Sequence, residues 1–218
     1  MTTMTEKIDS KLVKELREKS GAPMGDCLKA LQETKGNIED AFVVLRKRGV
    51  ASAQKKAART TNEGAVGSYI HAGGKIGVIV ELNCESDFVA RTEDFQELLK
   101  DIAMHIAASD PRYVKPEDVT VDDLEREKEI YRAQAAATGK PANIVERMVD
   151  GKMAKFYEEV CLLEQPFIKD QAISIKELIA QKVGKLGENI TVRRFARFKV
   201  GAPEWTVAQT KAVESTAE

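Results

Sequence analysis

Apolar side chains in residues 1–50 recur every three or four positions, the spacing that places them on one face of an α-helix. Residues that favour helix ends interrupt this pattern: residues 20–23 after the first apolar set, Gly36 and Asn37 after the second, and Gly49 after the third. The pattern therefore predicts a module of three short helices. Its apolar positions are Leu12, Val13, Leu16, Cys27, Leu28, Leu31, Ile38, Ala41, Phe42 and Leu45.

Residues 51–63 have no persistent apolar face. They are rich in Ala, Lys, Arg and Thr, a composition typical of a solvated connection. We expect a linker, partly helical at most, that separates the three-helix module from a second folding unit.

The hydrophobic period changes to two in the next segment. Residues 66–71 and 76–83 alternate and are joined through Gly73 and Gly74, which predicts a β-hairpin. One face of the second strand is apolar throughout. That face comprises Ile76, Val78, Val80 and Leu82.

A helix is predicted to follow this hairpin and to cover its apolar face. Thr92 and two acidic residues start the helix, and Asp110 and Pro111 end it. Its apolar stripe comprises Phe95, Leu98, Leu99, Ile102 and Ile106.

The later residues predict a polar helical hairpin over about 117–160, a short helix over 174–183 and a strand over 190–200 that joins the earlier sheet. Residues 203–218 form a tail whose structure the sequence does not decide. The predicted fold class is α+β: a three-helix module, then a small antiparallel sheet packed with helices and a protruding helical hairpin, with the core over 64–202.

Composition limits where the protein acts and what it binds. The formal charge is −1, with 34 basic and 35 acidic residues, so no overall field favours nucleic acid or anionic membrane. Three well-separated cysteines suit a reducing compartment. Residues 1–9 contain no signal-like apolar stretch, and no run of about 18 apolar residues occurs. We expect a cytoplasmic protein with no membrane partner.

Signs of enzyme chemistry are weak. The two histidines, His71 and His105, lie on separate elements and share no ligand spacing with a cysteine. His105 borders the apolar stripe of its helix, which favours a packed histidine. No glycine-rich phosphate motif opens a helix. We expect no metal, no cofactor and no bond chemistry, so the protein is predicted not to be an enzyme.

An acid and an aromatic residue meet where the second strand ends. Ser86, Asp87, Phe88 and Val89 stand there, just before the helix that Thr92 starts. The residues alone permit a structural role, in which the acid caps the turn while the two apolar side chains pack beneath the helix. They also permit a functional tip.

Segments along nearly the whole chain resemble elongation factor Ts. In the helical module they are LVKELR (12–17), SGAPMGDC (20–27), AL (30–31) and GNIEDA (36–41). In the core they are ELNCESDFVA (81–90), IAMHIAA (102–108) and CLLEQPF (161–167). The chain is similar to the short bacterial form. Two departures are Ser86, where the family often has Thr, and Gly25, where some members have a second Met.

The resemblance implies a guanine nucleotide exchange factor that binds elongation factor Tu in its GDP-bound and nucleotide-free states during translation elongation. It implies that residues 1–50 bind the GTPase and that residues 64–202 are the exchange domain. Asp87 and Phe88, within the motif of residues 86–89, would be the tip that disturbs the partner's Mg²⁺ and phosphate site. Leu12, Val13 and Met24 would contact the nucleotide domain, although Leu12 and Val13 can equally belong to the module's own core.

The core is shorter than the two-halved core of longer family members. We therefore hypothesise a homodimer, held by the sheet or by the helical hairpin. Sequence does not choose between these contacts.

Two other functions remain open. RNA or ribosome binding could use the strand over 193–199, with help from Lys55, Lys56 and Arg59. Peptide binding could use the three-helix module, which looks like a ubiquitin-associated (UBA-like) domain. The strand residues concerned are Arg193, Arg194, Arg197 and Lys199, around Phe195 and Phe198.

Overall fold

A computed structural model describes residues 8–202 and 206–209. The first three helices form the predicted module: α1 (Ser10–Ser20), α2 (Met24–Glu33) and α3 (Ile38–Lys56). Gly21 ends α1 in the left-handed conformation, and Asn37 caps α3 through its side chain. The module has a core of its own. Its buried residues are Val13, Leu16, Cys27, Ala30, Leu31, Ala41 and Leu45.

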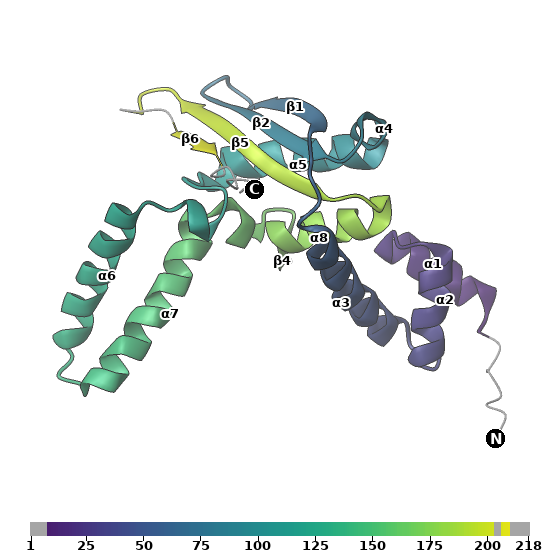
Figure 1. Cartoon of the computed structure of the whole chain (residues 1–218), viewed down its shortest axis with the longest axis horizontal. Helices are drawn as coiled ribbons and strands as arrows, with labels where there is room; N and C mark the ends of the chain where they lie inside the picture. The colour runs from purple at the N-terminus through teal and green to yellow at the C-terminus, as the bar shows by residue number, and fades with distance from the viewer. Residues whose placement is uncertain (1–7, 203–205, 210–218) are drawn as a thin grey trace, which may run out of the picture.

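The predicted end of the third helix at Gly49 is wrong, because α3 continues to Lys56. The second half of α3 packs on α8 (Ile175–Leu186), as Figure 1 shows. Gly49 and Gly184 meet where the two helices cross, so the small residues serve close approach rather than a helix end. Only residues 57–62 connect α3 to the sheet without helix or strand.

Within the described residues, four antiparallel strands form the sheet, in the order β1-β2-β5-β6. The predicted hairpin is confirmed as β1 (Glu63–Ile70) and β2 (Ile76–Cys84), and β5 (Ile190–Lys199) pairs with β2. β6 (Thr206–Gln209) adds an edge strand within residues 203–218, whose structure the sequence does not decide. Ala208 of β6 lies opposite Phe195 and is buried in the main core, which holds the edge strand in place.

One face of the sheet is covered by helices, and the main core lies between them (Figure 1). α5 (Glu93–Ser109) contacts β1 and β2, capped by Thr92 at its start and by Asp110 at its end. Its predicted apolar stripe is buried against the predicted apolar face of β2. α8 packs on α5 and β5 from the side of the three-helix module.

The helical hairpin is confirmed as α6 (Val121–Ala136) and α7 (Ala142–Val160). It projects from the sheet and its helices at the end opposite α1 and α2, as Figure 1 shows. The sequence did not indicate three short connecting elements and a strand pair. These are α4 (Asp87–Ala90), the 3-10 turns η1 (Pro116–Asp118) and η2 (Leu162–Glu164), and the pair β3 (Pro166–Phe167) and β4 (Asp170–Ser174). The α+β fold class is confirmed.

Candidate functional site

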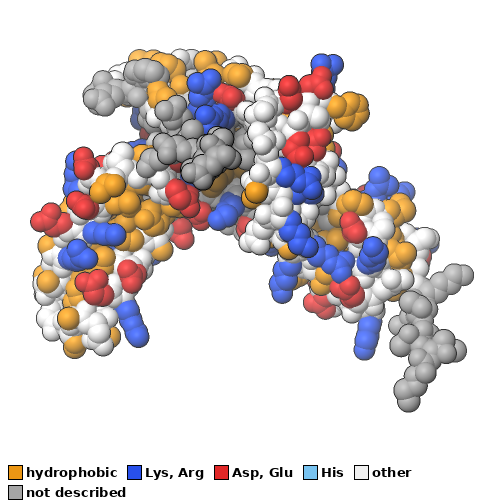
Figure 2. Space-filling model, in the orientation of Figure 1, with side chains coloured by type: hydrophobic (Ala, Val, Ile, Leu, Met, Phe, Trp, Pro, Cys, Tyr) orange, Lys and Arg blue, Asp and Glu red, His pale blue; other side chains and the backbone are white. Residues whose placement is uncertain are grey.

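The acid and the aromatic residue stand on α4, a single helical turn between β2 and α5. Val89 and Ala90 of this turn are buried in the main core. Phe88 is 77% exposed, the largest exposed fraction among the exposed large hydrophobic side chains of the described residues. In Figure 2 apolar surface projects beside charged side chains at the end of the molecule where α4 lies. The packing alternative is therefore right for Val89 and wrong for Phe88.

Asp87 lies at the surface beside Phe88. Its Oδ2 accepts a hydrogen bond from Nη2 of Arg91 at 2.7 Å, and both side chains are mostly exposed. An exposed pair of this kind contributes about 0–1 kcal/mol, so little holds the carboxylate to its own arginine. α4 thus presents a carboxylate and a ring together, and a partner can engage both.

Ser86 caps the turn from below. Its Oγ accepts from the backbone N–H of Val89 at 3.4 Å and donates to Oε1 of Glu188 at 2.7 Å. Its backbone N–H donates to Oε2 of Glu188 at 3.0 Å. Ser86 is therefore a support for the tip.

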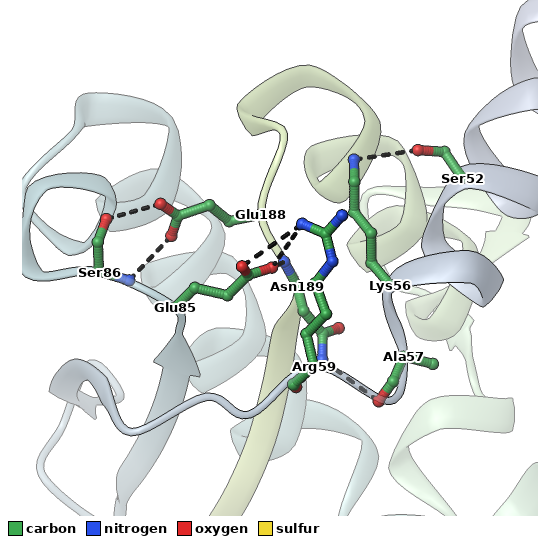
Figure 3. A network of polar contacts seen from close by, with 8 residues as sticks. All are labelled: Ser52, Lys56, Ala57, Arg59, Glu85, Ser86, Glu188 and Asn189. Atoms are coloured by element: carbon green, nitrogen blue, oxygen red, sulfur yellow. Dashed lines mark hydrogen bonds and ion pairs between the residues drawn. The ribbon is translucent and has the colours of Figure 1, made fainter.

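A polar network at the base of the tip joins three segments distant in sequence (Figure 3). Oε1 of Glu85 accepts from the backbone N–H of Asn189 at 2.6 Å and from Nη1 of Arg59 at 3.4 Å. Nδ2 of the buried Asn189 donates to the carbonyls of Arg59 at 2.9 Å and Ala57 at 3.4 Å. The residues after α3, after β2 and after α8 are thereby held together.

Sequence reasoning missed these supporting residues. Glu85 stands in the recognised motif without a predicted role, and the sequence marks neither Glu188 nor Asn189. Ser86 and Glu188 are 102 positions apart, and no spacing in the chain marks the pair.

The structure places the three predicted contacts of the three-helix module in different surroundings. Val13 is buried in the module's core and Leu12 packs against that core. Met24 is 50% exposed and Leu28, one turn later on α2, is 38% exposed. Of the predicted contacts, Met24 lies at the surface, and its exposed neighbour Leu28 is one of the apolar positions of the helical pattern.

His105 has a structural place. It is fully buried, its Nδ1 accepts from the backbone N–H of Ile168 at 3.3 Å, and its Nε2 lies 2.9 Å from Oε1 of Gln165. Nε2 therefore carries the proton and donates to Gln165. Burial lowers the pKa of His105 below its usual 6.5, so the ring stays neutral in the fold.

Other places in the described residues offer little chemistry. No cluster of three or more His, Cys, Asp or Glu side chains suits a metal ion there. A cleft of about 230 Å³ between the module and α8 is lined in part by Lys19, Arg46 and Lys185. Each of these cations already pairs with a carboxylate. Within the same residues, no helix combines the length and the apolar character needed to cross a membrane.

The basic strand is not a continuous basic surface. Phe195 and Arg197 are buried, and Arg197 binds Asp110 and the carbonyl of Ala107. Nε of Arg194 pairs with Glu81 at 2.6 Å across the sheet. A bulge in the pairing of β5 with β2 shifts the alternation by one residue, which places Arg197 inside. The geometry therefore does not favour RNA binding by this strand.

Taken together, the fold and the tip define a two-module binding protein that presents an acid and a ring on a fixed turn. A family model described as Elongation factor TS matches residues 7–202. An elongation factor Ts of Koribacter versatilis is 70% identical over 205 residues, 94% of each chain. The elongation factors Ts of Solibacter usitatus and Carboxydothermus hydrogenoformans are 58% and 56% identical, each over 89% of this chain, covering 92% and 89% of theirs.

The chain belongs to the elongation factor Ts family. The family consists of nucleotide exchange factors for elongation factor Tu in translation elongation, which act by binding and not by bond chemistry.

Proposed function

We propose that this protein releases GDP from elongation factor Tu by inserting the Asp87–Phe88 tip beside the partner's Mg²⁺ and phosphate site. The observation that carries the proposal is Phe88, a large ring left 77% exposed on a turn whose next two residues are buried. An exposed ring adds nothing to the stability of the fold, whereas a binding partner can bury it.

The neighbouring acid supplies charge where the ring supplies volume. Asp87 can leave its exposed pair with Arg91 at a loss of about 0–1 kcal/mol. Brought close to a Mg²⁺ ion, its carboxylate competes with the oxygen ligands that hold the ion and repels the phosphates. The two side chains thereby act on the same nucleotide.

The tip alone is too weak for large acceleration. A release rate raised about 10⁴-fold requires about 5.5 kcal/mol, whereas burial of one phenylalanine contributes about 1.5–3 kcal/mol. A broader interface, above about 1,000 Å², must hold the tip in place. We propose that the surface around Met24 and Leu28 on α2 supplies part of this interface. The partner would be bound in its GDP-bound and its nucleotide-free state.

The binding is reversible by the same coupling. If the exchange factor lowers the affinity of the GTPase for GDP, GDP lowers the affinity of the GTPase for the exchange factor by the same ratio, because the coupling free energy between two sites is reciprocal. The exchange factor therefore leaves when nucleotide returns. This role belongs in the cytoplasm, where translation proceeds.

The test loads elongation factor Tu with fluorescent GDP and follows its release when this protein is added. Phe88→Ala and Asp87→Asn should slow release strongly, with unchanged circular dichroism. The matched control is Ile130→Ala, which truncates another exposed apolar side chain, 42% exposed on α6 at the far end of the molecule. Equal rates for Phe88→Ala and Ile130→Ala would refute the tip.

We further propose that two copies of the chain associate through the open face of the sheet. The strand register brings exposed apolar side chains of four strands side by side, and the flanking charges of Glu81 and Arg194 neutralise each other. An apolar face of this kind is self-complementary in a two-fold dimer. The side chains are Val66, Ile70, Ile79, Phe198 and Val207.

Light scattering at micromolar concentration tests this association. Ile79→Lys should give a monomer, because it places a charge in the centre of the face. Ile130→Lys places the same charge on the helical hairpin, outside this face, and should leave the dimer intact. A monomeric wild-type protein, or a dimer broken by Ile130→Lys alone, contradicts the proposal.

A further inference from the structure

We propose that Glu188 is a positioning residue for the tip, acting through Ser86 to fix the turn that carries Asp87 and Phe88. The inference rests on the exchange function proposed above and deepens it. Glu188 lies in the loop between α8 and β5 and is drawn with its contacts in Figure 3.

The carboxylate of Glu188 decides how the hydroxyl of Ser86 is used. A serine hydroxyl has one proton to donate and lone pairs with which to accept. Here the proton goes to Oε1 of Glu188 at 2.7 Å, so a lone pair remains directed at the N–H of Val89. The second carboxylate oxygen takes the backbone N–H of Ser86 at 3.0 Å. Glu188 thus orients the helix cap as well as the chain that enters it.

The two loops hold each other in a reciprocal way. The carboxylate of Glu188 accepts from the backbone N–H of Ser86. In return, the carboxylate of Glu85, the residue before Ser86, accepts from the backbone N–H of Asn189 at 2.6 Å. Each loop therefore supplies one carboxylate and one backbone donor. Charge-assisted bonds of this type are about twice as strong as neutral ones.

The loop of Glu188 and Asn189 also binds the segment that follows the three-helix module. The buried side chain of Asn189 donates to the carbonyls of Ala57 and Arg59, directly after α3. The base of the tip is thereby fixed to the segment that orients the module. A partner held by both parts meets the tip in a set position.

The tip needs such support because its own turn is short. α4 has four residues, far fewer than an isolated helix needs to be stable. Val89 and Ala90 anchor its end in the core, while Asp87 and Phe88 gain nothing from the core and stay exposed. Without the cap, the anchored end would persist and the tip would sample other orientations.

Exchange kinetics on GDP-loaded elongation factor Tu test the proposal, with the full chain and its concentration varied. Glu188→Ala should lower the maximal release rate about fivefold, since loss of a helix cap costs about 1 kcal/mol, which is that factor in rate. The concentration for half-maximal rate should change less than about twofold, because the contacting surfaces remain. A merely destabilised protein would not separate the two parameters in this way.

Conservative variants sharpen the assignment. Ser86→Thr keeps the hydroxyl and should match the wild type, whereas Ser86→Ala should resemble Glu188→Ala. Because Glu188 acts through Ser86, the double variant should be no slower than the slower single variant. Glu188→Gln, which keeps one acceptor oxygen, should lie between Glu188→Ala and the wild type and guards against a misfolded alanine variant.

A second readout does not depend on the partner. Amide hydrogen exchange at residues 87–90 should accelerate in Glu188→Ala while the amides of α5 stay protected. The matched control is Glu164→Ala, which removes a carboxylate of the 3-10 turn η2 that pairs with Lys176 at 3.6 Å. It should change neither readout.

The outcomes separate this inference from the function beneath it. An inactive wild-type protein overturns the exchange function. An active wild-type protein with Glu188→Ala unchanged in maximal rate, or additive effects of Ser86→Ala and Glu188→Ala, overturns the positioning role and leaves the exchange function standing.

Discussion

The crossing of α3 and α8 makes a prediction whose sign depends on side-chain size. A Cβ atom built on Gly184 would lie 3.5 Å from Cα of Gly49, an ordinary van der Waals contact. A methyl group therefore fits at this position. Anything larger must push the two helices apart, because backbone stands on the other side of the contact.

The magnitudes follow from two opposing terms. Alanine is favoured over glycine within a helix by about 0.8–1.0 kcal/mol, and leucine is nearly as good. Gly184→Ala should therefore stabilise the protein by up to about 1 kcal/mol. Gly184→Leu gains the same helix propensity but overpacks the crossing, which costs about 1–3 kcal/mol, so its net effect should be zero or destabilising.

Thermal unfolding is the assay. For a chain of this size, 1 kcal/mol corresponds to about 2–4 °C in Tm. The control is Gly151 on α7, whose Cβ would meet nothing within 4 Å, so both Gly151→Ala and Gly151→Leu should raise Tm. If Gly184→Leu raised Tm as much as Gly184→Ala did, α3 and α8 would not be in close contact and the continuous α3 would be wrong.

Three further outcomes follow from buried contacts. Gly67→Ala should destabilise by about 1–3 kcal/mol in denaturant titration, because its Cβ would lie 2.6 Å from Cγ of the buried Leu99. The free energy of unfolding should fall as pH drops through about 6.5, because burial lowers the pKa of His105, so the unfolded chain binds a proton there that the folded chain does not bind. Between about pH 7.5 and about pH 5.5 the Tm of His105→Gln should therefore fall less than that of the wild type. Arg197→Leu should cost about 1–3 kcal/mol by chemical denaturation, since the carbonyl of Ala107 loses a buried donor while Asp110, half exposed, returns to water; a neutral result would show that water replaces the arginine.

Local patterns carried most of the fold. The alternation in β2 and the apolar stripe of α5 each identify the face that is buried, because residues two apart in a strand, or three to four apart in a helix, lie on the same face. The caps at Thr92 and Asn37 were equally readable. Such signals lie within a few residues of the structure that they specify.

Signals that depend on distant partners were misread. Gly49 has the residue type of a helix end, and only its contact with Gly184 shows why the helix continues. β6 has four residues, and Ala208 reads as part of a strand only once Phe195 lies opposite it. The alternation of β5 slips at its bulge, so Arg197 looked like a surface cation.

The candidate site divides in the same way. The motif around Asp87 and Phe88 could be found in the sequence because it is contiguous, but its orientation could not. The bonds that Ser86 at the base of this turn makes to its distant partner Glu188 follow from no local rule. The apolar pattern of α2 likewise does not tell that Leu28 is exposed while Leu31 is buried, since a small module buries only part of each helix.

The continuous α3 bears on how the two proposed binding surfaces, on α2 and at the tip, would cooperate. A flexible linker over residues 51–63 would let the module search, and part of the interface energy would be lost in ordering it. Instead α3 packs in both cores: Ala41 and Leu45 lie in the module's core, and Ala53 packs on the main core. The distance between the α2 surface and the Phe88 tip is therefore set before the partner arrives. Under the proposed function, binding free energy gained at the α2 surface would then act at the tip, where burial of a single exposed ring supplies too little.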